Sequence, residues 1–173
     1  MTPFSFEHVF RADSPAEVLR AFWDPSHQRA QDVAVAITER TVLELRDTAD
    51  DRVRITRIVP KRQLPALVRP FVSGPLHYVE TARWTKRTHE VELEIVPSLL
   101  GGRAVIRVLY RLSPAGTGLI RRSYAGSVSV DVALLSSRIE RGIIAEFERS
   151  LPLAAEATQR WLDGAEPMMS ARA

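Results

Sequence analysis

The sequence predicts an α+β domain in which a curved, seven-stranded antiparallel sheet wraps around one long C-terminal helix. Segments that alternate apolar and polar residues follow one another through residues 33–132, interrupted by one long loop over residues 61–75 whose core could form one or two helical turns. The last periodic segment, residues 135–162, instead repeats its apolar residues every three to four positions. Consecutive strands with helices at the two ends are typical of α+β proteins with an antiparallel sheet.

The N-terminal elements are a strand and two short helices. Residues 4–10 place Phe4, Phe6, His8 and Phe10 on one face of a strand. Ser14 and Glu17 have the spacing of a capping box, which predicts a helix start. That helix should end at Asp24, because the residue before a proline leaves the helical region. A second short helix is expected over about residues 26–32.

Six further strands are predicted by period-two alternation, and each has one face expected to point inward. These faces are Val35, Ile37, Thr41, Leu43 and Leu45; Val53, Ile55, Arg57 and Val59; Leu76, Tyr78, Glu80, Ala82 and Trp84; Val91, Leu93 and Ile95; Ala104, Ile106, Val108, Tyr110 and Leu112; and Ile120, Arg122, Tyr124, Val128 and Val130. Residues 61–75 form a loop that is rich in proline yet still apolar, and apolar loops of this length are usually functional.

One long helix must cover the apolar face of the whole sheet. The sheet should therefore curl around the helix, and the space between them is either filled by side chains or left as a cavity. Pro152 lies inside the helix and is expected to kink it or split it near Glu148. We expect one domain over residues 3–163, followed by a disordered tail over 164–173.

Composition excludes several classes of protein. The chain has 173 residues, a net charge of +3 and no cysteine, so neither disulfides nor thiolate metal sites are expected. No apolar run reaches the length of a membrane span, and no secretory signal is recognisable, so we expect a cytoplasmic protein without stable membrane insertion. The arginines are dispersed among acids, which disfavours nucleic-acid binding.

Three groups of residues carry a family resemblance. The first is Phe4 to Phe10 followed by Ser14-Pro15-Ala16-Glu17-Val18 and Phe22-Trp23, and the second is the long helix after the strand 124–132. With these features the chain resembles the START/Bet v 1-like (SRPBCC, polyketide cyclase-like) superfamily over about residues 3–163. The third group, Leu64-Pro65-Ala66, Gly74-Pro75-Leu76-His77-Tyr78 with Glu80 and Trp84, and Ile139-Glu140, resembles a bacterial branch of unknown function.

The resemblance implies the helix-grip fold, with a cavity between the sheet and the last helix. Relatives bind lipids, sterols, polyketides or plant hormones there, and in some the loop equivalent to residues 61–75 acts as a lid. The pattern of inward-facing residues and this resemblance together give the predicted ligand-binding set. Its members are Arg57, Phe71, Tyr78, Glu80, Trp84, Tyr110, Arg122, Tyr124, Ile139, Ile143 and Phe147.

Polar residues among inward strand faces are the main chemical signal. A buried charge must be paired or hydrogen-bonded. Arg57 and Glu80 are expected to pair across neighbouring strands, and with Arg122 to orient a ligand carboxylate, phosphate or hydroxyl. The alternative is an ion pair near a strand end that binds nothing. The four histidines lack metal-ligand spacing, so we expect no metal and no cofactor, and no catalytic residue is assigned.

Three functions remain open from the sequence. The first is a carrier or sensor of a hydrophobic small molecule such as a lipid or polyketide. The second is an enzyme of the polyketide cyclase or dehydratase type, with acid–base residues drawn from His8, Arg57, Glu80, Tyr110 or Tyr124. The third is a protein-interaction module with a packed, ligand-free interior. Nothing in the sequence fixes the oligomeric state.

Overall fold

The computed structural model describes residues 1–61 and 76–164, apart from the side chains of residues 99 and 100. The loop expected over 61–75 and the tail expected over 164–173 fall almost wholly outside the described residues, so both stay predictions. The elements are β1 (Thr2–Arg11), α1 (Pro15–Trp23), α2 (Pro25–Ala34), β2 (Ile37–Asp47), β3 (Asp51–Pro60), β4 (Tyr78–Thr85), β5 (Glu90–Pro97), a short 3₁₀ turn (Leu99–Gly102), β6 (Ala104–Gly116), β7 (Leu119–Val130) and α3 (Ser136–Leu162).

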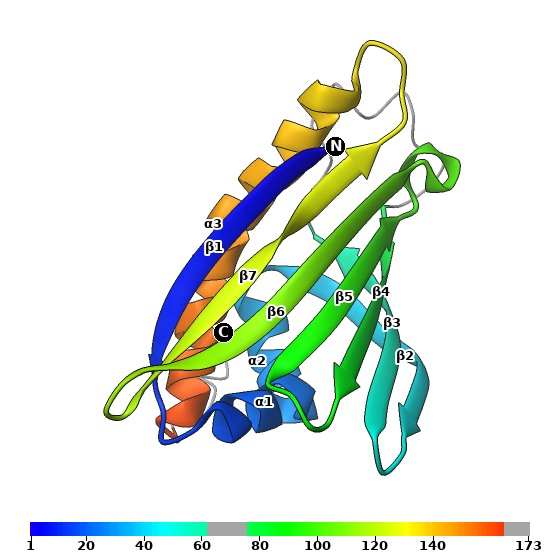
Figure 1. The fold of residues 1–173 in the computed structure, drawn as a ribbon. Coiled ribbons are helices and arrows are strands. Elements are labelled where there is room, and N and C mark those ends of the chain that lie inside the picture. Colours follow the sequence, from blue (N-terminus) through cyan, green and yellow to red (C-terminus); the bar gives the residue numbers. More distant parts are fainter. Residues whose placement is uncertain (62–75, 165–173) are drawn as a thin grey trace, which may run out of the picture.

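The strands form one antiparallel sheet in the order β1-β7-β6-β5-β4-β3-β2. Figure 1 shows this sheet curving so that α1, α2 and α3 all lie on its concave side. α3 packs along β1 and β7 and against α2. The predicted α+β class, the seven strands, the two short helices after the first strand and the long final helix are confirmed. β2 and β1 are the two edges of the sheet.

Local sequence signals set the two short helices. The side chain of Ser14 caps α1 by accepting a hydrogen bond from the backbone N–H of Glu17 at 3.3 Å. Asp24 both ends α1 and caps α2, because its Oδ1 accepts the backbone N–H of Ser26 at 2.7 Å. The sharp joint between the helices therefore follows from a single aspartate before a proline.

Pro152 does not split α3, which continues from Ser136 to Leu162. A proline inside a helix leaves the carbonyl four residues earlier, here that of Glu148, without its usual partner. Both Pro152 and Glu148 are exposed, so water can satisfy this carbonyl. The proline is therefore accommodated on the solvent-exposed side of α3, and the expected split of the helix does not occur.

Hydrogen bonds fix α3 near each of its ends. Near its start, the carboxylate of Glu140, which is 1% exposed, accepts the backbone N–H of Val130 at 2.9 Å and the hydroxyl of Thr2 at 2.6 Å. Near its end, the amide of Gln159 accepts the backbone N–H of Arg11 at 2.8 Å and donates to its carbonyl at 3.2 Å. Both contacts tie the helix to the β1–β7 side of the sheet.

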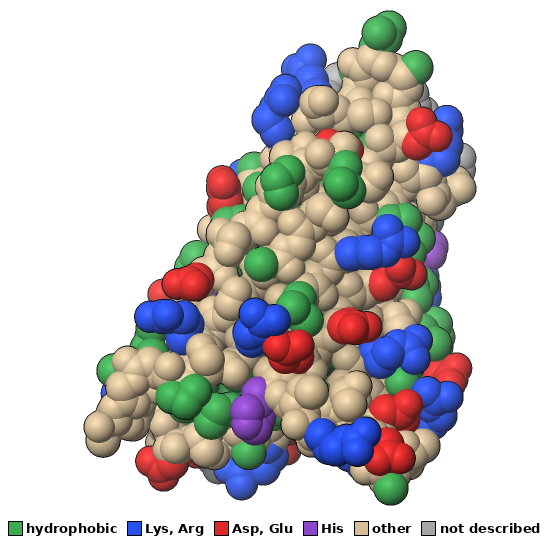
Figure 2. All heavy atoms as spheres, in the orientation of Figure 1, with side chains coloured by type: hydrophobic (Ala, Val, Ile, Leu, Met, Phe, Trp, Pro, Cys, Tyr) green, Lys and Arg blue, Asp and Glu red, His purple; other side chains and the backbone are tan. Residues whose placement is uncertain are grey.

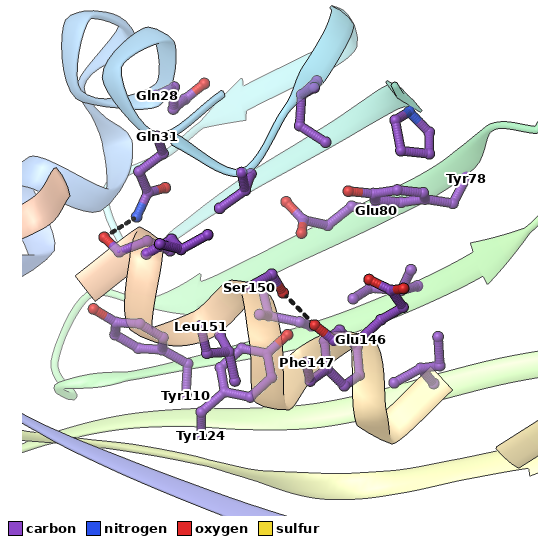
Figure 3. Close-up of a pocket in the computed structure, with 18 of the residues that line it drawn as sticks. Gln28, Gln31, Tyr78, Glu80, Tyr110, Tyr124, Glu146, Phe147, Ser150 and Leu151 are labelled. Carbon is purple, nitrogen blue, oxygen red and sulfur yellow. Dashed lines mark hydrogen bonds between the residues drawn. The ribbon is translucent and has the colours of Figure 1, made fainter. Parts of the chain in front are cut away.

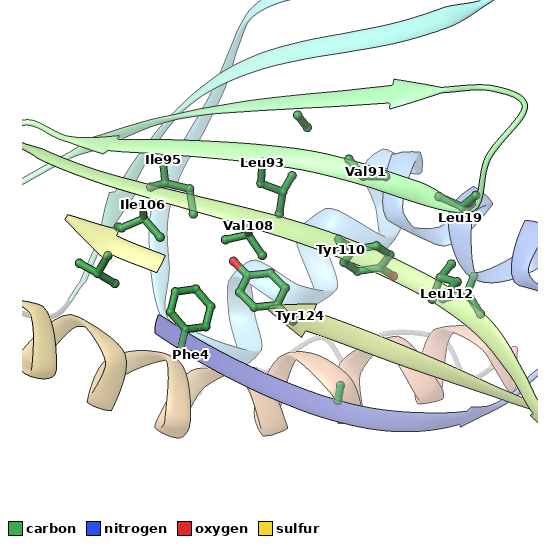
Figure 4. Close-up of a cluster of buried hydrophobic side chains, with 14 of the residues drawn as sticks. Phe4, Leu19, Val91, Leu93, Ile95, Ile106, Val108, Tyr110, Leu112 and Tyr124 are labelled. Carbon is green, nitrogen blue, oxygen red and sulfur yellow. The ribbon is translucent and has the colours of Figure 1, made fainter. Parts of the chain in front are cut away.

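The hydrophobic core lies on the concave face of β5, β6, β7 and β1. Figure 4 shows the side chains of this cluster projecting from neighbouring strands towards α3. Val91, Leu93 and Ile95 alternate with exposed glutamates, as the sequence predicts for a strand with one buried face. Core packing is therefore concentrated on one half of the sheet.

The convex face has mixed charge. Figure 2 shows arginine and acidic side chains distributed over this face without a large cluster of one sign. Several of them pair across neighbouring strands, as in Arg107 with Glu94 at 3.1 Å and Arg111 with Glu90 at 2.6 Å. Exposed pairs of this kind add little to stability, but they keep the outer surface hydrated.

The predicted inward face of β3 is wrong. Arg54, Thr56 and Ile58 are buried on the concave side, whereas Arg57 points to the outer side and pairs with Glu39 of β2 at 2.9 Å. Both faces of this strand mix apolar and polar residues, and the more apolar of the two is the outer one. The outer face tolerates its apolar side chains because long neighbours cover them; Val53 lies opposite the arginines of both adjacent strands.

The apolar residues of β2 are not buried as a single face. Val42, Leu43 and Leu45 are 48%, 56% and 54% exposed. The pairing of β2 with β3 shifts register between Val42 and Glu44, so a bulge breaks the alternation there. The predicted inward phase of this strand therefore fails at its centre.

Candidate functional site

A cavity of about 340 Å³ lies between the concave face of the sheet, the two short helices and the middle of α3. This volume falls within the range of small-molecule sites. Its apolar walls come from facing elements: Leu93, Ile95 and Ile106 from the sheet, and Ile143, Phe147 and Leu151 from α3. Figure 3 shows Phe147 and Leu151 of α3 beside Tyr124 of the sheet on one side of this space, with Tyr78 and Glu80 on the other side.

The cavity exists because one helix is too narrow for the sheet. α3 covers β1 and β7, whereas β3, β4 and β5 curve away from it. Ile143, Phe147 and Leu151 recur at four-residue spacing on the inward side of α3, yet each is only partly buried. Fully packed core positions would exclude solvent almost completely. The solvent-accessible surface that Ile143, Phe147 and Leu151 retain is the part that faces the cavity and its opening.

Three tyrosines place hydroxyl groups in the cavity wall. Burial raises the pKa of Tyr110 to about 12 and raises the pKa of Tyr78 and of Tyr124 still further. All three are therefore neutral near pH 7, able to donate and accept hydrogen bonds but unable to act as phenolate bases. Phe4 and Phe147 pack on Tyr124, with ring centroids 6.1 Å and 5.8 Å from it, which holds this ring in place.

Arg122 lies on the inward face of β7 beside His8 of β1. It is 3% exposed, and its Nη2 lies 3.0 Å from Nδ1 of His8. Its guanidinium also sits over the rings of Phe10 and Tyr110, at 5.1 Å and 6.0 Å from the centroids. Partial burial, reinforced by Arg122, lowers the pKa of His8 to about 4, so the imidazole is neutral and accepts from the guanidinium.

The α2 side of the cavity is polar. The Nε2 of His27 lies 3.0 Å from Oγ1 of Thr158 in α3, and Nε2 of Gln31 donates to the same oxygen at 3.1 Å. Thr158 in turn donates to the carbonyl of Ala154 at 2.8 Å. Burial lowers the pKa of His27 to about 4, so this imidazole is also neutral near pH 7.

A second set of polar side chains comes from α2, β2 and β3. Arg40 forms a two-pronged ion pair with Asp32 of α2, with an Nη2–Oδ1 distance of 2.7 Å. Arg54 is 4% exposed and sits over the rings of Phe22 and Trp23, at 5.3 Å and 4.8 Å from the centroids. Burial lowers its pKa to about 10, which still leaves it charged near pH 7.

Seven predicted ligand-binding residues line the cavity, namely Tyr78, Glu80, Tyr110, Arg122, Tyr124, Ile143 and Phe147. Figure 3 shows Tyr78 and Glu80 side by side at some distance from Tyr110. Their role in binding stays a prediction.

The remaining members of the predicted set lie elsewhere. Arg57 is on the outer side of β3, and the predicted Arg57–Glu80 pair does not form, because Val79 rather than Glu80 is opposite Arg57. Trp84 packs on Trp23 outside the cavity and donates from Nε1 to the carbonyl of Thr88. Ile139 is core at the start of α3. Phe71 lies outside the described residues.

The sequence interpretation missed the polar cavity residues of α2 and of the strands next to it. His27 and Gln31 are four residues apart, which puts them on one helix face. That spacing was a usable signal. The sequence contains no comparable signal for Arg40 or Arg54, because each lies in a strand for which the alternation pattern predicts the wrong inward face.

Among residues 1–61 and 76–164, no three His, Asp or Glu side chains gather in a way that could hold a metal ion. In the same residues, no helix combines the length and hydropathy needed to cross a bilayer.

The fold and the cavity define an α+β protein of the helix-grip type with an internal space of small-molecule size. A family model described as "Protein of unknown function (DUF2505)" matches residues 5–162, and the chain belongs to this family. No curated protein matches the sequence.

Solved structures share the fold at low sequence identity. TTHA0849 from Thermus thermophilus has a TM-score of 0.65 at 11% identity, covering 94% of this chain and 98% of its own. The ZhuI aromatase/cyclase from Streptomyces sp. R1128 has a TM-score of 0.61 at 7% identity, covering 93% of each chain. A START superfamily protein from Mycobacterium smegmatis has a TM-score of 0.60 at 7% identity, covering 95% of this chain and 99% of its own. At these identities the similarity shows the fold alone.

Proposed function

We propose that this protein binds a hydrophobic small molecule, such as a lipid or a polyketide, in the cavity between the sheet and α3, and that it acts as a carrier or sensor. The observation that carries the proposal is the cavity of about 340 Å³ with aliphatic and aromatic walls. An apolar cavity with a few convergent polar groups is the usual form of a small-molecule site. A START superfamily protein and an aromatase/cyclase among the structures with this fold are consistent with the proposal.

The ionisation states of His27 and Tyr110 in the cavity wall, and of His8 beside Arg122, favour binding over acid–base catalysis. A general base is most effective when its pKa lies near the working pH. The pKa values of His8 and His27 are lowered to about 4, and that of Tyr110 is raised to about 12. Near pH 7 the imidazoles are weak bases and the phenol is a weak acid. These groups are better suited to orienting a ligand by hydrogen bonds.

Filling the cavity provides the direct test. Ile143→Trp adds a large ring to the α3 wall, whereas Val9→Trp adds the same ring at an outward-facing position of β1 that is 51% exposed. Each protein is purified without detergent, and its bound small molecules are measured by native mass spectrometry and solvent extraction. Titration with the neutral dye N-phenyl-1-naphthylamine measures the free cavity.

We expect wild type and Val9→Trp to bind the dye or retain a co-purified ligand, and Ile143→Trp to lose at least ten-fold in dye affinity at an unchanged fold by circular dichroism. A wild-type protein that carries no ligand and binds no dye would overturn the proposal. Equal dye binding by Ile143→Trp and wild type would show that binding occurs elsewhere, and would overturn it as well.

A further inference from the structure

Two buried arginines of the cavity wall form no direct ion pair, although the charge of Glu80 acts on Arg54 from beyond ion-pair distance. Among the described residues, no carboxylate lies within ion-pair distance of Arg122 or of Arg54, although these side chains are only 3% and 4% exposed. The Nε atoms of both are buried without a hydrogen-bond partner. The groups that contact them are aromatic faces, the neutral imidazole of His8 and the hydroxyl of Tyr110 at Arg122, and the carbonyl of Phe22 at 3.5 Å from Nη1 of Arg54.

The same cavity shows how a satisfied arginine is arranged. Arg40 also lines it, and its guanidinium makes three hydrogen bonds of 2.7–3.0 Å to both oxygens of Asp32. Removing a guanidinium from water is costly unless an anion or several acceptors replace the water. Aromatic faces replace only part of that hydration. Arg122 and Arg54 are therefore cations whose binding capacity is only partly used within the described residues.

The two guanidinium groups flank the same end of the cavity. Arg54 sits over Phe22, the ring of Phe22 lies 5.2 Å from that of Tyr110, and Arg122 sits over Tyr110. This chain of contacts puts both cations next to α1. Glu80 lies closer to the other end of β4, opposite Thr56, and Figure 3 shows it beside Tyr78 and away from Tyr110. An anion is therefore favoured at the α1 end and disfavoured beside Glu80.

We propose that the ligand is an apolar molecule bearing one carboxylate, and that this carboxylate lies at the α1 end of the cavity, held by Arg122 with support from Arg54 and the Tyr110 hydroxyl. This inference rests on the proposed function and names the chemical class of its ligand. A guanidinium presents parallel N–H groups that match the two oxygens of a carboxylate. The aliphatic and aromatic walls would then hold the rest of the molecule. Fatty acids and aromatic carboxylic acids share this chemistry.

Matched pairs of acids and alcohols test the proposal without any mutation. Decanoate is compared with decanol, and 2-naphthoate with 2-naphthol, by displacement of N-phenyl-1-naphthylamine from the wild-type protein at pH 7.5. We expect the acid of at least one pair to bind ten-fold or more tightly than its alcohol. The pair that shows the preference distinguishes an aliphatic from an aromatic ligand. Equal affinities in both pairs would overturn the carboxylate inference while leaving the proposed function intact.

Three variants then locate the carboxylate. Arg122→Met keeps the length and apolar stem of the side chain, and we expect it to abolish the preference for the acid without weakening alcohol binding. Arg54→Met should reduce the preference less. Arg57→Met is the matched control, because Arg57 lies on the outer side of the sheet. A full preference retained in Arg122→Met would overturn its assignment. If neither the dye nor any of the four ligands binds wild type, the proposed function itself fails.

Discussion

The Nε2 of His27 lies 3.0 Å from Oγ1 of Thr158, so a buried imidazole connects α2 to α3 at the wall of the cavity. His27 is 2% exposed, and its ring also packs edge-on against Trp161 at 5.7 Å between centroids. Protonation would place a charge in this enclosed position. The contact therefore makes the packing of α2 on α3 sensitive to acid.

We expect the free energy of unfolding to fall as the pH drops from about 6.5 to 4. The folded pKa of His27 is about 4, below its ordinary value of 6.5, so the unfolded chain binds more protons in this window. This contribution is fully present above about pH 6.5, and roughly 2 kcal/mol of it is lost by pH 5. Urea unfolding between pH 4 and 8 measures it. His8 has a folded pKa of about 4 as well, so His27→Gln should reduce the slope without abolishing it, whereas His89→Gln, at an exposed position, should leave it unchanged. An unchanged slope in His27→Gln would contradict the assignment.

Glu140 should be a large contributor to stability at the start of α3. Glu140→Ala removes the acceptor of the backbone N–H of Val130 and of the Thr2 hydroxyl, and should cost about 2 kcal/mol or more. Glu140→Gln keeps a carbonyl oxygen for Val130 and should cost about 1 kcal/mol. Glu148→Ala, at an exposed position of the same helix, serves as the control. Chemical denaturation gives all three values, and a cost for Glu140→Ala no larger than the control would refute this role.

Gly126 has no room for a side chain. A Cβ at this position of β7 would lie 1.9 Å from the carbonyl oxygen of Arg107 in β6, which is backbone and cannot rotate away. Gly126→Ala should therefore destabilise the protein by about 2–4 kcal/mol, because β6 and β7 would be forced apart.

Gly142→Ala is the matched substitution in α3. A Cβ there meets nothing within 4 Å, so alanine should stabilise the helix by about 0.5–1 kcal/mol. Thermal unfolding of both variants measures the contrast. Similar destabilisation by the two substitutions would show that strand spacing is not what requires Gly126.

The Arg40–Asp32 pair should show strong coupling in a double-mutant cycle. Both side chains are largely buried, with 17% and 15% of their surface exposed, and the geometry is two-pronged. Arg40→Met and Asp32→Asn should be coupled by about 1–3 kcal/mol in unfolding free energy. The exposed pair Arg107–Glu94 should give less than about 1 kcal/mol. Equal coupling in the two cycles would mean that burial does not strengthen the inner pair.

The fold could be predicted because several segments permit only one interpretation. In β5, Val91, Leu93 and Ile95 alternate with glutamates, so the buried face is unambiguous. At α1, Ser14 and Asp24 mark the start and the end of the helix through local hydrogen bonds. Such signals depend on near neighbours in the chain and survive without knowledge of tertiary contacts.

The polar part of the candidate site could not be predicted in the same way. Arg54 faces inward although the residues on either side of it, Val53 and Ile55, are more apolar. Predicting the inward face of a strand from alternation assumes that the concave side of the sheet excludes water and charge completely. A cavity wall does not meet that assumption. The predicted pairing of Arg57 with Glu80 failed for the same reason, because an error of one residue moves every side chain of a strand to the other face.

The fastening of α3 has a consequence for how the protein can change over evolution. Glu140 holds the helix at one end and Gln159 at the other, whereas Ile143, Phe147 and Leu151 lie between them and face the cavity. The attachment of the helix is thus separate from the side chains that shape the interior. Substitutions along the central turns would remodel the chamber while the termini of the helix stay anchored, so one scaffold can acquire new ligand preferences without first losing its architecture.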